Sequence, residues 1–278
     1  MTGNTQTLVD TAWLADHLDD PNVRLIEIDW TGTGAYDEGH IPGALGWNWK
    51  ETLWDPAVRE FPTPEEFARR LGAAGIANDT TVVFYGGPVQ FGTYGWWVFK
   101  FCGHADVRML DGGRVRWVKE GRPLSREVPK FAPVEYIPAA RNDSMRIGRD
   151  GVLDHIGREG TLILDHRSPE EYRGEMVGVP GMPDVGAERY GRIPGARHLP
   201  FTDFLGEDET FKDAGAIRSL LEECGAAEAR DIISYCRLSH RATLAYFAMT
   251  EILDHGNLKV YDGSWTEWGS MVGMPIDP

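Results

Sequence analysis

Internal repetition is the feature of this sequence that most constrains its fold. Residues 71–86 (LGAAGIANDTTVVFYG) align without a gap with residues 221–236 (LEECGAAEARDIISYC), at an offset of 150. Two further pairs of segments recur in the same order at offsets of 152 and 151, namely IPGA at 41–44 and 193–196, and Asp-Gly followed by Trp at 111–117 and 262–268. Ordered matches at nearly constant spacing rarely arise by chance, so we interpret the 278-residue chain as a tandem duplication.

The two copies predict two domains of ordinary size. The segment between them, PLSREVPKFAPVEYIPAAR at 123–141, holds four prolines and has no helical periodicity, which is typical of a linker. We therefore expect an N-terminal domain over 1–125, a linker over 126–141 and a C-terminal domain over 142–278. The second copy also carries a Gly- and Pro-rich insertion around 174–191, which we expect to form a surface loop.

Short apolar runs alternate with amphipathic stretches in both copies, which predicts an α/β fold with a mainly parallel sheet flanked by helices in each domain. The runs predicted as strands are 25–29, 81–85, 107–110, 162–165, 231–235 and 258–261, and the predicted helices include 63–71, 214–224 and 241–253. Aligning the first of these strands in each copy pairs Asp29 with Asp165. Ligands of such sheets bind beyond the carboxyl ends of the strands.

Composition excludes several classes of function. Asp and Glu number 43 against 28 Lys and Arg, a net charge of −15, so no nucleic-acid partner is expected. No apolar stretch is long enough to span a membrane, and the first residues lack the pattern of a signal peptide. The only cysteines are Cys102, Cys224 and Cys236, a low and odd number that favours a reducing, cytoplasmic location and excludes a disulfide scaffold. No Cys or His spacing indicates a metal site.

Cys236 is predicted to lie at the carboxyl end of a strand, where parallel sheets bind their ligands. It follows the predicted strand 231–235, and the loop RLSHR at 237–241 leads from it into a predicted helix. The helix N-terminus, together with Arg237, Arg241 and His240, favours a thiolate, which is the nucleophilic form of cysteine. A tight loop can also turn backbone N–H groups inward around an anion. We therefore predict that Cys236 is a nucleophile.

The other cysteines and the first copy provide the contrast. Cys102 and Cys224 lie in helical segments, where a cysteine is usually a small core residue. In the first copy the position of Cys236 is occupied by Gly86, and no basic residue follows before Lys100. We expect the first domain to be inactive and the second to be catalytic.

A set of motifs in a fixed order resembles one known family. The set comprises the tandem pair, GHIPGA at 39–44, GRIPGA at 191–196, LDHRSPEEYRG at 164–174, the Cys loop at 236–241 and YDGSWTEW at 261–268. Over about residues 7 to 275 the chain is similar to the two-domain rhodaneses, which comprise the thiosulfate and mercaptopyruvate sulfurtransferases. The resemblance implies that Cys236 accepts a sulfane sulfur as a persulfide and passes it to cyanide or a thiol, without a cofactor.

The resemblance also implies roles for neighbouring residues. The backbone N–H groups of the loop would hold the terminal sulfur; its residues are Arg237, Leu238, Ser239, His240 and Arg241. Arg237 follows the cysteine as in thiosulfate-using members, whereas mercaptopyruvate-using members resemble CGSGVT here. Phosphatases that share this domain have a loop one residue longer. His240 is equally compatible with an exposed surface position.

Four further residues have roles that the sequence leaves open. Asp165 ends a predicted strand and Arg167 follows it. The two residues either support the site or form a capped turn with a solvated arginine. We expect the site to face the space between the domains, where Trp30 of the first copy would contribute a wall. Glu171 stands where animal members carry a substrate-binding arginine, so anion binding must differ in detail.

These observations predict a thiosulfate sulfurtransferase that works with a small-molecule sulfur donor and acceptor, with a thiol protein as a further candidate acceptor. Two alternatives stay open. One is a 3-mercaptopyruvate sulfurtransferase, and the other is a carrier or sensor that holds the persulfide for a protein partner without turnover.

Overall fold

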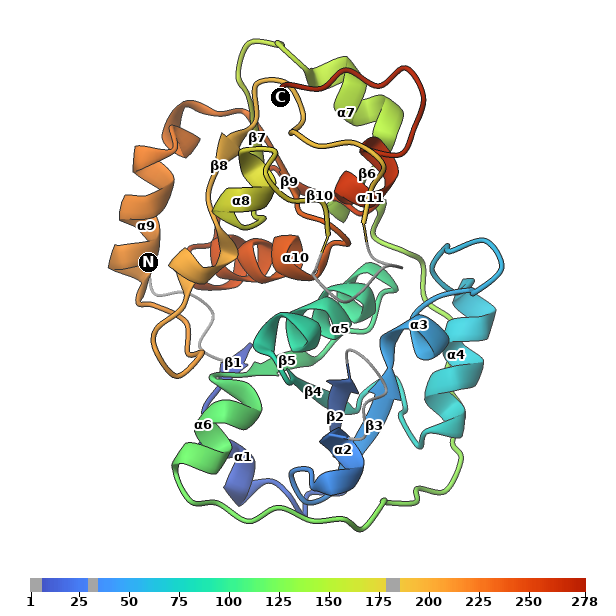
Figure 1. Ribbon diagram of the computed structural model, residues 1–278. Coiled ribbons are helices and arrows are strands. Elements are labelled where there is room, and N and C mark those ends of the chain that lie inside the picture. Colours follow the sequence, from blue (N-terminus) through green and yellow to red (C-terminus); the bar gives the residue numbers. More distant parts are fainter. Residues whose placement is uncertain (1–6, 30–34, 179–185) are drawn as a thin grey trace. The chain divides into compact units, whose positions relative to one another are not determined.

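The computed structural model describes residues 7–29, 35–178 and 186–278. The chain forms two compact units. The C-terminal unit comprises Asp143–Gly206 and Lys212–Pro278, and the N-terminal unit comprises the preceding residues up to Asn142 together with the short segment Glu207–Phe211. Each unit is built on one five-stranded parallel sheet (Figure 1).

The sheet of the N-terminal unit has the strand order β1-β5-β4-β2-β3. Its strands are β1 (Leu8–Val9), β2 (Val23–Asp29), β3 (Ala44–Asn48), β4 (Thr81–Gly86) and β5 (Val107–Leu110). Its helices are α1 (Thr11–Asp16), α2 (Ala35–Glu38), α3 (Trp49–Thr52), α4 (Pro64–Ala73), α5 (Val89–Phe101) and α6 (Gly113–Lys119).

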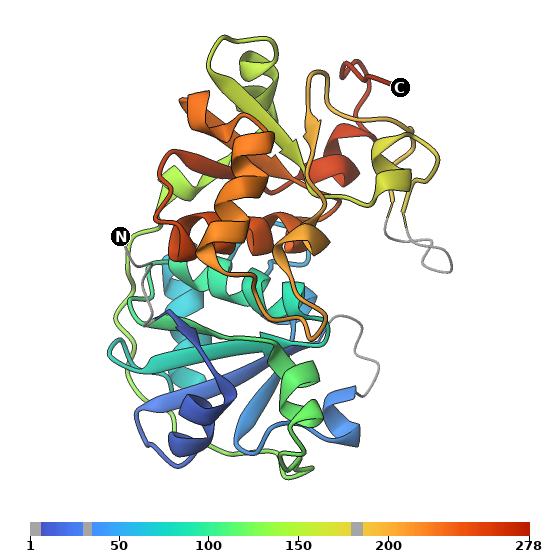
Figure 2. The same ribbon diagram turned by 90° about the vertical axis from the view of Figure 1, so that its left-hand side faces the viewer.

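Helices cover both faces of this sheet, which explains why the middle strand β4 is buried along nearly its whole length (Figure 2). On one face Leu25 and Val83 join a core that includes Leu14 of α1 and Trp117 of α6. On the other face α5 crosses β4, and the rings of Phe84 and Phe99 meet edge to face with their centroids 4.7 Å apart.

The C-terminal unit repeats this plan with the strand order β6-β10-β9-β7-β8. Its strands are β6 (Arg146–Ile147), β7 (Thr161–Asp165), β8 (Arg197–His198), β9 (Asp231–Tyr235) and β10 (Leu258–Tyr261). Its α-helices are α7 (Arg149–His155), α8 (Pro169–Tyr172), α9 (Ala214–Glu223), α10 (His240–Phe247) and α11 (Ser264–Trp268), and shorter turns are η1 (Asp143–Met145), η2 (Phe201–Phe204), η3 (Ala226–Glu228) and the π-helix η4 (Ala248–Ile252).

The predicted fold class is confirmed, since both units are parallel α/β structures. The sequence prediction omitted all four edge strands. Of these, β1, β6 and β8 have only two residues and carry no periodic pattern, and β3 overlaps the end of the IPGA segment, which was considered only as a repeated motif. It was also wrong about the counterpart of Asp165. The strand registers pair Asp165 with Tyr235 and Glu27 with Tyr85, so Glu27, not Asp29, matches it. A shift of two residues along a strand keeps the same face, so the alternation of side chains cannot reveal such an error.

The proline-rich segment that we expected to be a linker contacts the N-terminal unit along its length. Val134 donates its N–H to the carbonyl of Gly72 at 2.9 Å. The hydroxyl of Tyr136 lies 3.0 Å from Nδ1 of the buried His104. These contacts explain why the unit extends to Asn142.

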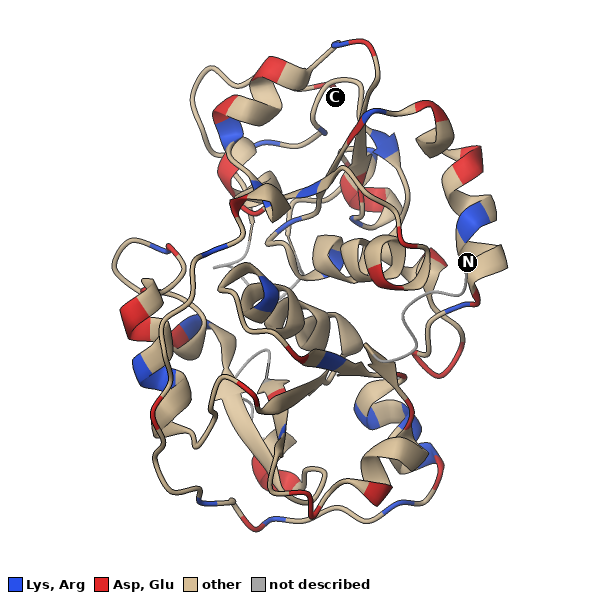
Figure 3. Ribbon diagram, turned by 180° about the vertical axis from the view of Figure 1, so that it is seen from behind, with Lys and Arg blue, Asp and Glu red and all other residues tan. Residues whose placement is uncertain are grey.

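Charged residues are distributed over the helices and loops of both units, with Asp and Glu intermixed with Lys and Arg (Figure 3). Within the described ranges, no helix is long and apolar enough to cross a membrane.

Candidate active site

Cys236 lies at the carboxyl end of the central strand of the C-terminal unit, one residue past β9 and four before α10. It is only 1% exposed. Its backbone is fixed by the start of α11, because its N–H donates to Ser264 Oγ at 3.2 Å and its carbonyl accepts from the N–H of Trp265 at 3.0 Å. The fold therefore holds the thiol at a defined place on the sheet edge.

The loop after Cys236 is held in place by hydrogen bonds to residues 262–266, which follow β10. Ser239 has a left-handed φ of 71°, and its hydroxyl donates to the backbone carbonyl of Asp262 at 2.6 Å, a contact that supports this unusual conformation. The carbonyl of Arg237 accepts from the N–H of Thr266 at 3.1 Å. In contrast, the N–H groups of Arg237, Leu238 and Ser239 donate to no acceptor among the residues that the structure describes. Unused N–H groups in a tight loop form an anion-binding cradle.

Arg237 adds a positive charge with no hydrogen-bonded counterion in the described parts of the chain. Its Nε and Nη1 atoms are buried and have no hydrogen-bond partner there. Burial lowers the pKa of Arg237, and the nearby charge of Arg241 lowers it further. Buried guanidinium groups are normally paired. The arrangement therefore indicates that an anionic ligand completes the site.

The cation at the other end of the loop is paired. Arg241 donates from Nη1 and Nη2 to the two carboxylate oxygens of Glu171, at 2.6 and 3.0 Å. Glu171 also accepts the N–H of Ser168 at 3.1 Å, as part of a capping box at the start of α8. Burial alone would raise the pKa of Glu171, but the hydrogen bonds and charge of Arg241 lower it to about 2, so the side chain is a carboxylate at neutral pH.

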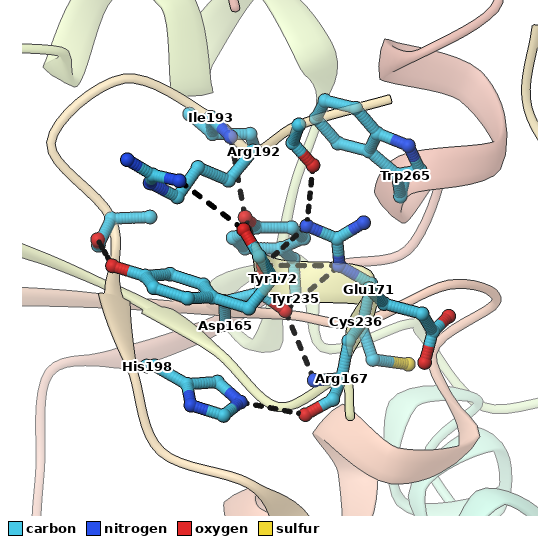
Figure 4. A network of polar contacts seen from close by, with 12 residues as sticks. Asp165, Arg167, Glu171, Tyr172, Arg192, Ile193, His198, Tyr235, Cys236 and Trp265 are labelled. Carbon is cyan, nitrogen blue, oxygen red and sulfur yellow. Dashed lines mark hydrogen bonds and ion pairs between the residues drawn. The ribbon is translucent and has the colours of Figure 1, made fainter. Parts of the chain in front are cut away.

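A second ion pair lies in the interior, next to the strand that carries Cys236 (Figure 4). Arg167 donates from Nη2 to Asp165 Oδ2 at 2.6 Å, and the hydroxyl of Tyr235 donates to the same oxygen at 2.6 Å. The hydroxyl in turn accepts the N–H of Ile193 at 3.2 Å. The guanidinium carbon of Arg167 lies 4.5 Å from the centroid of the Trp265 ring. Both charged side chains are buried, so Arg167 is not the solvated arginine of the alternative interpretation.

The N-terminal unit contains the same network without a nucleophile. Tyr85 donates to Glu27 at 2.6 Å and accepts the N–H of Ile41 at 3.1 Å, and Arg114 pairs with Glu27 at 2.6 Å. Arg114 occupies the position in α6 that Trp265 occupies in α11, as the repeat alignment places both three residues after the conserved Asp. Because the network occurs in a unit that has no cysteine at the loop, we interpret its role as structural.

The corresponding loop of the N-terminal unit has no room for a side chain. A Cβ atom at Gly86 would lie 2.6 Å from the nitrogen of Gly92 and 2.8 Å from the carbonyl oxygen of Pro88. Both obstacles are backbone atoms and cannot move aside easily. Glycine is therefore a steric requirement at the position that Cys236 occupies in the other unit.

The remaining candidates are placed as follows. In the loop, Leu238 is partly exposed and His240 is buried, so His240 is not the surface residue of the alternative interpretation. Trp30 lies outside the described residues. Cys102 is buried, which raises the pKa of its thiol to about 12, and burial also raises the pKa of Cys224. Among the described residues, no group of three or more His, Cys, Asp or Glu side chains could hold a metal ion.

The sequence analysis missed the residues that hold the loop in place. Asp262 and Ser264 were considered only as members of the motif YDGSWTEW, and Glu171 only for a missing arginine. One sequence signal could have placed Asp262 near the loop. Asp262 directly follows the strand β10, and β10 lies beside β9, the strand that precedes Cys236. Glu171 and Arg241 lie 70 positions apart, and no sequence pattern indicates their pairing.

The fold and the site together define the class of protein to which this chain belongs. It is a duplicated parallel α/β protein with a buried cysteine at the end of the central strand of one unit. Residues 10–120 and 149–271 each match the family described as Rhodanese-like domain. The chain therefore belongs to the rhodanese family, in two tandem copies, and the resemblance seen in the sequence is confirmed.

Two relatives illustrate the similarity. The chain is 46% identical over 275 residues to "Sulfur carrier protein TtuD" of Thermus thermophilus, an alignment that covers 98% of this chain and 96% of the relative. It is 41% identical over 273 residues to "Putative thiosulfate sulfurtransferase" of Saccharopolyspora erythraea, with 98% and 96% covered.

The fold also matches solved structures. An anaerobic ergothioneine biosynthesis enzyme from Chlorobium limicola, in complex with trimethyl histidine, superposes with a TM-score of 0.85 at 25% identity, over 99% of this chain and 70% of that chain. The wild-type structure of EanB gives a TM-score of 0.86 at 24% identity, with 99% and 70% covered.

Proposed function

We propose that this rhodanese is a sulfurtransferase that takes the sulfane sulfur of thiosulfate and passes it, through a persulfide on Cys236, to a thiophilic acceptor. The observation that carries this proposal is that Cys236 is followed by three residues whose N–H groups are unused and by the unpaired nitrogens of Arg237, within the part of the chain that the structure describes. Such N–H groups would bind the negative charge of a persulfide, and the guanidinium would bind the anionic part of a donor.

The reaction proceeds in two displacements. In the first, the Cys236 thiolate attacks the outer sulfur of thiosulfate, the sulfur–sulfur bond of thiosulfate breaks, and sulfite leaves with the bonding electron pair. In the second, cyanide or a thiolate attacks the terminal sulfur of the persulfide. The bond between the two persulfide sulfurs breaks, thiocyanate or a new persulfide leaves, and the Cys236 thiolate is restored. Neither step needs an external oxidant or reductant.

The N–H groups of the loop and the side chain of Arg237 have different roles in this reaction. The N–H groups of Arg237, Leu238 and Ser239 stabilise the persulfide anion, and the side chain of Arg237 stabilises the departing sulfite. Because thiosulfate is a dianion, a partly buried cation without a hydrogen-bonded counterion among the described residues favours it over mercaptopyruvate, which has a single carboxylate.

A second candidate is favoured by one comparison. A relative with 46% identity is named a sulfur carrier protein, which suggests a protein that keeps the persulfide for a protein thiol or another protein partner. The two functions differ in turnover, because a carrier loads once whereas an enzyme releases sulfite continuously when thiosulfate and cyanide are both present. A reducing, cytoplasmic location, the absence of a nucleic-acid partner and independence of a cofactor all stay predictions.

The first prediction tests the nucleophile. After incubation with thiosulfate, mass spectrometry of peptides should show a gain of one sulfur, about 32 Da, on Cys236. Cys236→Ser should abolish thiocyanate formation while circular dichroism shows an intact fold, and Cys102→Ser and Cys224→Ser should retain most activity. Labelling of Cys102 or Cys224 instead would overturn the assignment. A faster reaction with 3-mercaptopyruvate than with thiosulfate would overturn the proposed donor.

A further inference from the structure

We propose that Glu171 is a positioning residue that sets the donor specificity of this site. By neutralising Arg241, it leaves the Cys236 loop with Arg237 as its uncompensated arginine and so weakens the preference for dianionic over monoanionic donors. This inference rests on the proposed function and identifies which residue tunes it.

The geometry shows that Glu171 directs its charge at the loop. Both of its carboxylate oxygens accept hydrogen bonds from Arg241, and its side chain is only 5% exposed. Arg241 is the last residue of the loop that begins with Cys236, and its side chain is 15% exposed. Solvent therefore screens this pair weakly, and the two charges largely cancel each other at the site.

Two further ion pairs lie near the loop in the described part of the chain. Asp262, which accepts a hydrogen bond from the loop residue Ser239, pairs with Arg146 at 3.2 Å. Arg167 is paired with Asp165, at 2.6 Å. Arg237 is close enough to Arg241, Glu171 and the Cys236 sulfur for their charges to influence it. Glu171 and Arg241 cancel, as do Asp165 and Arg167, so Arg237 is the arginine left to bind a donor.

Glu171 also caps α8, and a glutamine can do the same. The capping box needs a side-chain acceptor for the Ser168 N–H, and both Glu and Gln supply one. Glu171→Gln therefore removes the charge with little change in shape. Arg241 then becomes an uncompensated second cation beside the donor.

The test compares two donors that share one chemistry and differ in charge. Thiosulfate is a dianion that releases sulfite, and methanethiosulfonate is a monoanion that releases methanesulfinate when the same thiolate attacks its outer sulfur. The readout is the ratio of kcat/KM for thiosulfate to kcat/KM for methanethiosulfonate. A purely structural role of Glu171 would lower both values together and leave this ratio unchanged.

We expect Glu171→Gln to raise the ratio about tenfold, because the additional cation attracts the dianion more strongly. Arg241→Gln should lower the ratio, since it leaves the carboxylate uncompensated. The double variant Glu171→Gln/Arg241→Gln restores neutrality, and its ratio should return to within about twofold of the wild-type ratio.

Glu170→Gln is the matched control. Glu170 neighbours Glu171 in the same helix, but its side chain is 46% exposed and pairs with Arg173 away from the loop. Its substitution changes the net charge equally and should leave the ratio within about twofold of wild type. An equal effect of Glu170→Gln and Glu171→Gln, or an altered ratio that persists in the double variant, overturns the role of Glu171. If the wild-type protein transfers sulfur from neither donor, the proposed function itself fails.

Discussion

The buried ion pairs show how two copies of one ancestor kept an interaction and changed the residues that make it. In the C-terminal unit Arg167 is two residues from Asp165 in the sequence, whereas in the N-terminal unit Arg114 reaches Glu27 from a helix 87 residues further on. In both units the carboxylate also accepts a hydrogen bond from a tyrosine on the neighbouring strand. Both units therefore have a buried carboxylate paired with an arginine near the end of this strand, although the arginine comes from a different part of the sequence in each unit.

A prediction at the residue scale follows from this pairing. Arg167→Leu should lower the free energy of unfolding by about 3–5 kcal/mol, because it leaves Asp165 charged and buried without its partner. Urea denaturation measures this loss. Arg173→Leu removes an arginine whose side chain is 51% exposed and should cost no more than about 0.5 kcal/mol. A loss as small in Arg167→Leu as in this control would contradict the structural role.

Individual residues also show how far sequence reasoning reaches. The structural correspondence of Cys236 with Gly86 could be predicted, since a repeat alignment compares residues at one fixed offset. Glu27 could not be matched to Asp165, because sliding a strand by two residues preserves its pattern of apolar and polar faces. The pairing of Glu171 with Arg241 depends on how α8 meets the Cys loop, and that is a property of tertiary packing.

At the scale of elements, the two strand-to-helix connections differ in their backbone. In the loop from Cys236, three successive N–H groups donate to no acceptor among the described residues. Hydrogen bonds to Asp262 and Ser264 hold this loop in place. In the N-terminal unit α5 begins at Val89, three residues after Gly86. Backbone atoms of Pro88 and Gly92 therefore occupy the space next to Gly86. The difference between the copies at this position is therefore built into the backbone and goes beyond the identity of one side chain.

The expected behaviour of Gly86→Cys follows from this difference. The added side chain meets backbone atoms at 2.6 and 2.8 Å, so the substitution should lower the free energy of unfolding by about 1–3 kcal/mol. It should also add no sulfur transfer, which is best measured in a Cys236→Ser background. Gly148→Ala is a suitable control, because no atom lies within 4 Å of its added Cβ and the cost should be below about 1 kcal/mol. Measurable transfer by the Gly86→Cys variant in that background would show that the loop can rearrange.

At the scale of the whole molecule, the compact units do not follow the order of the sequence. Glu207–Phe211 lies within the second repeat but belongs to the N-terminal unit. There Phe211 donates its N–H to the carboxylate of Asp111 at 2.8 Å, and Glu209 accepts the N–H of Val89 at the start of α5, at 3.1 Å. Pro88, at the N-cap of α5, makes no side-chain capping bond, so Glu209 supplies the cap that local sequence lacks.

Removing this carboxylate should therefore weaken α5. We expect Glu209→Ala to destabilise the N-terminal unit by about 0.5–2 kcal/mol, the usual cost of a lost helix cap. Amide hydrogen exchange at Val89 and the first turn of α5 should accelerate correspondingly. The exposed Glu207 provides the control, and Glu207→Ala should leave the exchange of these amides unchanged. Unchanged exchange in Glu209→Ala would mean that this contact does not cap the helix in solution.

The place of Glu207–Phe211 also bears on the history of the gene. Immediately after a duplication, each copy can be lost, moved or fused to other proteins as an independent module. Once a segment encoded by the second copy completes the fold of the first, a gene divided at the proline-rich stretch no longer yields two self-sufficient products. The copy with glycine at the Cys236 position and the copy with cysteine there must then be inherited together, and selection on one half is also selection on the other.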